Sequence, residues 1–248
     1  MARTSLGWAA LVGFGLGGFF DGILLHQVLQ WHHLLSLVAG VDDLRAQVLW
    51  DGMFHVLMYV LAGAGLWGLL HAHRAGRLAG SQALAGGALL GFAAWQVVDL
   101  VVFHWLLEIH HIRIDVPNPV AWDLGWGALF GVPPALAGWA LLRRRGQGGG
   151  QGGGATFATL AALALVGGAW SARVPEGPFA VVFRPGAGLP AVLAALEAAD
   201  ARLVAGDPHA GFVVVDAEPG RRWAFYAHGA ILVGGAGLPA GCVAWSRV

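Results

Sequence analysis

The chain has 248 residues, of which 57% are hydrophobic and only 11% charged, with a formal net charge of +0 and a mean hydropathy of +0.67. A soluble domain carries about 25% charged residues, so this composition excludes an ordinary soluble protein and indicates a membrane protein. The neutral balance gives no basic surface for nucleic acid. The single cysteine, Cys242, excludes an intrachain disulfide and a thiolate cluster.

Five apolar stretches reach, or come close to, the roughly 20 residues that a helix needs to span a bilayer. In chain order they cover residues 6–33, 48–70, 82–109, 120–142 and 155–172. The first four predict a four-helix bundle within residues 1–145, and the fifth, which has no ionisable residue, predicts a plain anchor. Glycine is abundant throughout, with 40 residues, so we give little weight to isolated patterns such as Gly13-x-x-x-Gly17.

The first and third stretches carry the same pattern of ionisable residues. The two copies, 78 positions apart, are Asp21-x4-His26-x5-His32-His33 and Asp99-x4-His104-x5-His110-His111. An ionisable side chain at mid-membrane costs roughly 2.5–3.5 kcal/mol on insertion scales, and such residues are therefore functional candidates by default. The exact repetition of the spacing argues that both copies serve one purpose.

The repeat continues into the second and fourth stretches, which both open on a Trp-Asp pair. Asp51 and His55 lie in the first of them, whereas the second has Asp123 and, in place of the histidine, Gly127. The pattern predicts a helical hairpin used twice, with the halves related by a pseudo-twofold axis along the membrane normal. The second half lacks one potential ligand.

A straight α-helix does not bring the four motif residues together. At about 100° per residue, Asp21 and His32 share one line of the helix, and His26 and His33 share another, roughly 100–140° away. Two arrangements remain open. Either the helix frays and reorients at the paired histidines, or the motif forms two layers, a deep one with the Asp and single His residues and a shallow one with the His pairs.

The residues of these patterns favour a metal centre in the bundle, where facing helices supply the ligands. Imidazole together with carboxylate suits Fe, Zn or Cu(II), and we expect copper or iron, with zinc as a further option. The aspartates could ligate directly or accept the hydrogen bond that fixes the tautomer of a ligating histidine. The candidate ligands are Asp21, His26, His32, His33, Asp51, His55, Asp99, His104, His110 and His111.

Three other interpretations remain open. Asp–His pairs could simply join two half-bundles, but membrane hydrogen bonds average only about 0.6 kcal/mol, which offsets little of the cost of burial. Haem could be held between histidines of the first and third helices, although haem gives no reason for adjacent histidines. A proton relay is the third. If a metal is bound, the protein is either a redox enzyme or a metal-handling factor that serves a respiratory oxidase.

Arginines near the helix ends predict the orientation in the membrane. They cluster at one set of ends, as Arg3, Arg74, Arg77, Arg143, Arg144 and Arg145. This bias places the N-terminus in the cytoplasm of a multi-pass inner-membrane protein. The histidine pairs then lie near the outer leaflet, and the C-terminal region is periplasmic or extracellular.

The C-terminal part of the chain has a different character. A glycine-rich linker (146–154) precedes the fifth stretch, and residues 173–248 predict a small α+β domain. Its expected elements are strands at 180–185, 202–205 and 211–217, a helix at 190–200, and apolar runs at 223–227 and 230–234. A domain of this size is marginally stable alone, so we expect it to lean on the bundle or on a partner, either another membrane protein or a second copy.

The segments GFFDGILLHQVLQWHH, DGMFH and HHIR together resemble a family of bacterial four-helix membrane proteins, domain of unknown function 2243. The resemblance covers roughly residues 6–142 and implies an integral membrane protein. It implies no particular activity. The fifth stretch and the C-terminal domain lie outside it.

Overall fold

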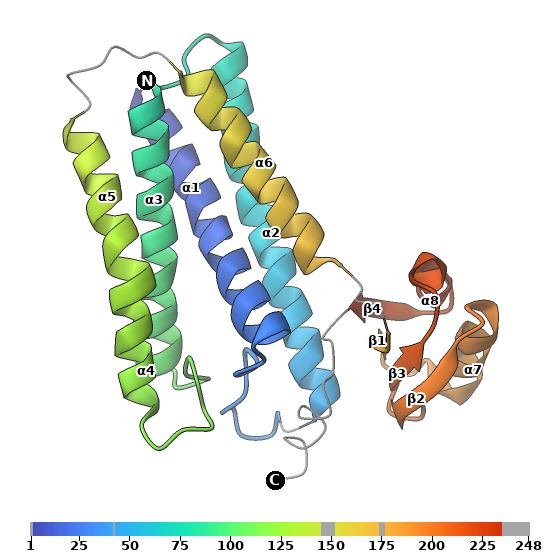
Figure 1. Cartoon of the computed structure of the whole chain (residues 1–248). Coiled ribbons are helices and arrows are strands. Elements are labelled where there is room, and N and C mark those ends of the chain that lie inside the picture. The colour runs from blue at the N-terminus through green and yellow to red at the C-terminus, as the bar shows by residue number, and fades with distance from the viewer. Residues whose placement is uncertain (1, 42, 145–151, 174–176, 235–248) are drawn as a thin grey trace.

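The computed structural model describes residues 2–41, 43–144, 152–173 and 177–234. It is mostly helical, with five helices long and apolar enough to cross a membrane and a small antiparallel sheet toward the C-terminus (Figure 1). Each predicted apolar stretch falls on one of these helices, which cover Thr4–Val28, Leu44–Arg74, Ser81–Leu106, Pro119–Arg143 and Gly153–Ser171.

Three of the five spans change from α-helix to π-helix along their length. Two are α-helical throughout, namely α2 (Leu44–Arg74) and α6 (Gly153–Ser171). The others are α1 (Ala2–Asp21) with η1 (Gly22–Val28), α3 (Ser81–Val98) with η2 (Asp99–Leu106), and α4 (Pro119–Trp126) with η3 (Gly127–Gly131) and α5 (Val132–Arg143). The first and third spans therefore end before both histidine pairs, which lie in the loops that follow.

Helices α2, α1, α3 and α5 pack side by side in this order as a row, and α6 packs across part of it. α1 and α3 pack against each other at the centre, α2 packs on α1, and α5 packs on α3. Figure 1 shows α2 and α5 on opposite sides of this central pair. α6 contacts α1, α2 and α3, so it covers the half of the row that contains α2.

Glycines allow the central pair to pack backbone against backbone. A Cβ atom at Gly13 would lie 1.8 Å from the carbonyl oxygen of Ala88, and one at Gly91 would lie 1.8 Å from that of Ala10. At Gly17 it would lie 2.7 Å from Cβ of Trp95. The low weight given to the Gly13-x-x-x-Gly17 spacing was therefore wrong, because these residues are at the α1–α3 contact, as small residues are in many membrane helix pairs.

Replacing Gly13 by leucine should separate α1 from α3. Because the obstructing atoms are backbone, the change should destabilise the protein by at least about 1–3 kcal/mol, the usual cost of overpacking. Thermal unfolding in detergent measures the effect. Gly7→Leu is the matched control, since a Cβ at Gly7, on the same helix, meets nothing within 4 Å. Equal melting temperatures for the two variants would contradict this packing.

The C-terminal region forms one sheet with two helices. The strands are β1 (Phe179–Phe183), β2 (Arg202–Asp207), β3 (Phe212–Asp216) and β4 (Ala230–Gly234), in the antiparallel order β2-β3-β1-β4. Helix α7 (Gly188–Ala198) connects β1 and β2. The apolar run 223–227 forms helix α8 (Trp223–Ala227) and the run 230–234 forms β4. Most of the expected glycine-rich linker, residues 146–151, lies outside the described residues.

The centre of the sheet is covered on both faces, so β1 is buried along its whole length, whereas the edge strand β2 is exposed along its whole length. One face, with Val181 and Phe183, packs against α7 and α8. The other face, with Ala180 and Val182, packs against Val48 at the start of α2. The small domain thus completes its hydrophobic core on the helical part of the protein, as its size requires.

Candidate metal centre

The π-helical segments align each motif aspartate with its histidine. A π-helix closes its turns between residues five apart, so those residues lie on one face of the helix. Asp21 and His26 are five apart at the α1–η1 junction, and Asp99 and His104 are five apart in η2. The same local change in winding therefore reduces, in both copies, the angle that an α-helix would leave between the aspartate and the histidine.

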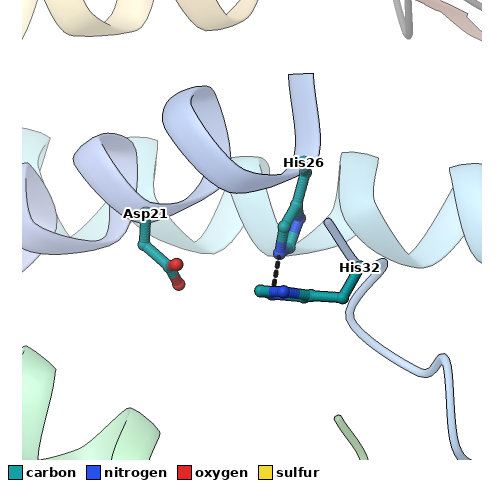
Figure 2. Close-up of side chains that lie close together, drawn as sticks. All are labelled: Asp21, His26 and His32. Carbon is teal, nitrogen blue, oxygen red and sulfur yellow. Dashed lines mark hydrogen bonds between the residues drawn. The ribbon is translucent and has the colours of Figure 1, made fainter. Parts of the chain in front are cut away.

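A sharp reversal then folds each histidine pair back onto its helix. Gln30 and Glu108, which occupy equivalent positions in the two copies, have φ angles of 52° and 50°. This left-handed conformation costs a residue other than glycine roughly 1–2 kcal/mol. After the first reversal, Nε2 of His32 lies 3.0 Å from Nε2 of His26 (Figure 2). Of the two arrangements left open by the sequence, the structure has the one in which the helix ends and the chain reorients.

The first cluster consists of Asp21, His26 and His32. All three are buried, and each offers one ligand atom within 4.8 Å of the others. Figure 2 shows Asp21 from the end of α1 directed toward the space that the two imidazoles face. Ligands held at about 2.0–2.2 Å from one ion lie up to about 4 Å apart, so a small inward movement would bring this trio to coordination distance.

The second cluster repeats the first with Asp99, His104 and His110, again buried and within 4.8 Å. Nε2 of His104 lies 3.1 Å from Oδ2 of Asp99. A further trio, His104, His111 and Asp123, meets the same distance limit and shares His104 with it.

Asp51 supports the loop that carries the first histidine pair. Its Oδ2 accepts a 2.6 Å hydrogen bond from Nδ1 of His33, and its Oδ1 accepts one of 2.8 Å from the backbone N–H of Leu34. Oδ1 also lies 3.2 Å from Nδ1 of His26. The backbone carbonyl of Asp51 accepts a hydrogen bond from Nδ1 of His55. His33 and His55 therefore flank the first cluster, joined to it through one aspartate.

Asp123 does the same for the second pair, although it was not among the predicted ligands. Its Oδ2 accepts a 2.7 Å hydrogen bond from Nδ1 of His111, while its Oδ1 accepts from the N–H of Ile112 and from Nδ1 of His104, each at 3.0 Å. The signal was present in the sequence, because the Trp-Asp pair that opens the fourth stretch repeats the one that contains Asp51.

Two reciprocal hydrogen bonds connect the clusters. Nδ1 of His32 donates to the carbonyl of Ile112 at 3.0 Å, and Nδ1 of His110 donates to the carbonyl of Leu34 at 2.8 Å. The two imidazoles stack with centroids 4.6 Å apart and planes 13° from parallel. Because a carbonyl only accepts, Nδ1 of each ring carries a proton, and Nε2 is the atom directed to its cluster. There Nε2 of His32 lies 3.0 Å from Nε2 of His26, and Nε2 of His110 lies 3.2 Å from Oδ1 of Asp99. Burial also lowers the pKa of both His32 and His110, which favours the neutral form that binds metals.

Several ligand-type atoms in this region are buried without a hydrogen-bond partner. An unsatisfied buried polar group costs about 1–3 kcal/mol, so a set of them in one place requires an explanation. The atoms are Asp21 Oδ1, His26 Nδ1, His55 Nε2, Asp99 Oδ2 and His104 Nε2. Three of these atoms nevertheless take part in close ionic contacts: His26 Nδ1 lies 3.2 Å from Asp51 Oδ1, and His104 Nε2 lies 3.1 Å from Asp99 Oδ2.

The fold and these clusters define a membrane protein with several apolar helices and candidate Asp/His groupings. A family model described as "Predicted membrane protein (DUF2243)" matches residues 9–145, and the chain belongs to this family. The match covers both clusters and all of the first four spans except the first residues of the first one, and it confirms the resemblance seen in the sequence. Neither the curated proteins nor the solved structures include a match to the chain.

Removing the Asp123 carboxylate should loosen the second loop. Asp123→Ala leaves His104, His111 and the N–H of Ile112 without their acceptor, and at about 1–3 kcal/mol for each unsatisfied group the loss should reach about 3 kcal/mol or more. Unfolding in metal-free detergent buffer measures it. Asp115→Ala, which breaks only an exposed pair with Arg113, is the control and should change nothing measurable. A similar loss in both variants would refute the role of Asp123.

Proposed function

We propose that this protein holds a metal centre with two adjacent sites, one at Asp21, His26 and His32 and the other at Asp99, His104 and His110. The observation that carries the proposal is that both clusters gather buried ligand atoms to which the described residues give no hydrogen bond. A bound cation would satisfy these atoms at once and would offset the cost of placing them in a membrane protein. Copper or iron suits the histidine–carboxylate set, and zinc is the next choice.

The duplicated hairpin is part of the same proposal. The hydrogen bonds of Asp51 to His33 and Leu34 recur as those of Asp123 to His111 and Ile112. A pseudo-twofold axis between the stacked rings of the two clusters accounts for the reciprocal bonds across them. Such an axis would place two ions close together, with one half supplying each.

The contacts favour this interpretation over its rivals. A purely structural network would give every buried donor and acceptor a hydrogen bond, whereas here Asp21 Oδ1 and His55 Nε2 have none among the described residues, and His26 Nδ1 and His104 Nε2 only lie close to a carboxylate. Bis-histidine haem needs two imidazoles on opposite faces of a porphyrin, but His32 and His110 stack directly on one another at 4.6 Å. A proton relay would use the same residues. Measuring the metal content of the purified protein distinguishes it from a metal centre.

Two activities fit a two-site centre of this kind. The first is redox chemistry, in which a pair of Cu or Fe ions activates oxygen or oxidises a small apolar substrate near the outer leaflet. The second is metal handling, in which the ion passes to a respiratory or oxidase partner. Burial of Asp99, His104 and His110 in the second cluster favours at least one retained ion and therefore redox chemistry. Exchangeable, weakly held metal would favour handling.

Metal content per chain tests the proposal. Detergent-purified protein should contain stoichiometric Cu or Fe, and His26→Ala, His104→Ala and Asp99→Asn should each lose most of one site, since even supporting residues change metal affinity about 10–100-fold. His71→Ala, an exposed histidine at the other end of α2, is the control and should retain the metal. A Soret band would indicate haem. Absence of both metal and chromophore after reconstitution would refute the centre.

We also propose that the protein is a multi-pass inner-membrane protein with the clusters and the sheet on the periplasmic side, based on the arginine bias. In a Cys242→Ser background, the Glu197→Cys variant, altered in α7, should react with a membrane-impermeant thiol reagent added to intact cells. The Arg77→Cys variant, altered between α2 and α3, should react only after lysis. The reverse pattern would invert the topology.

A further inference from the structure

The two clusters differ at one matched pair of positions. In the first half the ring of His55 lies against Gly22, where an added Cβ would be 2.6 Å from His55 Nε2. In the second half the equivalent residues are Gly127 and Leu100, and a Cβ at Gly127 would be 3.0 Å from Leu100 Cδ2. In the first half the glycine follows Asp21 and the large residue is His55 of α2. In the second half the large residue, Leu100, follows Asp99, and the glycine takes the place of the histidine, so leucine fills the space that histidine fills in the first half. Packing alone does not require an imidazole here.

The imidazole of His55 has an atom with nothing to bind. Its Nδ1 donates to the carbonyl of Asp51 at 2.9 Å, which leaves Nε2 as an unprotonated acceptor. Nε2 is buried and has no hydrogen-bond partner among the described residues. It lies beside Gly22, the neighbour of the cluster residue Asp21. The first half thus has one more nitrogen ligand available than the second.

The first cluster is also the one that adjoins a cavity. A cavity of about 250 Å³ separates α2 from the C-terminal domain. Its lining comes from both sides and includes His26, Asp51 and His55 from the helices and Arg222, Trp223 and Tyr226 from the domain.

The second cluster is enclosed on the corresponding side. The side chain of Asp51 is 13% exposed, whereas that of Asp123 is fully buried. A hollow does lie beside Gly127, but its described lining is almost wholly apolar and includes none of the second cluster's residues. His33 and His111 are similarly exposed, at 16% and 18%, so the difference between the halves arises at the cavity and not at the histidine pairs.

We propose that the first cluster is an exchangeable divalent-metal site, with His55 as an additional ligand, and that ions reach it through the cavity beneath the C-terminal sheet. The second cluster is the closed, slowly exchanging site. This inference rests on the proposed metal centre. The two halves then differ in function. The first holds an open site that ions or small ligands can enter, and the second holds a closed site that retains its ion.

Metal exchange in the full chain tests the inference. Protein loaded with Co²⁺ is mixed with excess Zn²⁺, and the loss of the cobalt absorption band is followed in time. The wild type should lose cobalt in two phases of about equal amplitude. Gly52→Leu should slow the fast phase by at least about tenfold without changing metal content. Gly52 lines the cavity, and its Cβ would already lie 2.8 Å from Leu232 Cδ1.

Two further variants control for misfolding and for ligand loss. Gly63→Leu, on the same helix with nothing within 4 Å of its Cβ, should exchange like the wild type. His55→Leu should retain the slow phase and lose most of the fast one. A single exchange rate in the wild type, or an unchanged fast phase in Gly52→Leu, would overturn the inference while leaving the metal centre intact. A wild type that retains neither Co²⁺ nor Cu, Fe or Zn after reconstitution would overturn both.

Discussion

The site depends on the reciprocal hydrogen bonds from His32 to the carbonyl of Ile112 and from His110 to that of Leu34. Each bond fixes the tautomer of one imidazole, so that Nε2 faces its cluster, and each satisfies a backbone carbonyl of the opposite loop. Neither half can form its cluster in this geometry without the other. The two loops are in turn held by Asp51 and Asp123, so four polar groups account for the shape of the whole region.

The sequence was sufficient for the spans and for the motif residues, because length, hydropathy and exact repetition are properties of the sequence alone. It was not sufficient for the winding of the helices. The i to i+5 closure that aligns Asp21 with His26 depends on how backbone hydrogen bonds are shared at the helix end, and no residue type marks it. The reversal at Gln30 was hidden for a similar reason, since glycine is the usual residue at such a left-handed position.

Other parts needed contacts between distant segments. Asp123 could have been inferred from the repeated Trp-Asp pair, but its four hydrogen bonds depend on the fold of the second loop. The importance of Gly13 was obscured by the abundance of glycine in the chain and becomes evident only when α3 is in place. The docking of the sheet on Val48 had no signal in the sequence beyond the small size of the domain.

The length of α2 has a mechanical consequence. Its 31 residues extend about 46 Å at 1.5 Å per residue, whereas the hydrocarbon core is only about 30 Å thick. A helix longer than the hydrocarbon core either tilts in the membrane or extends beyond it. How far it does so depends on the thickness of the surrounding bilayer. The C-terminal sheet is attached at the first turns of this helix, beside Val48. We therefore expect the thickness of the bilayer, and with it the lipid composition, to change the strain on the contact that encloses the cavity beside the first cluster.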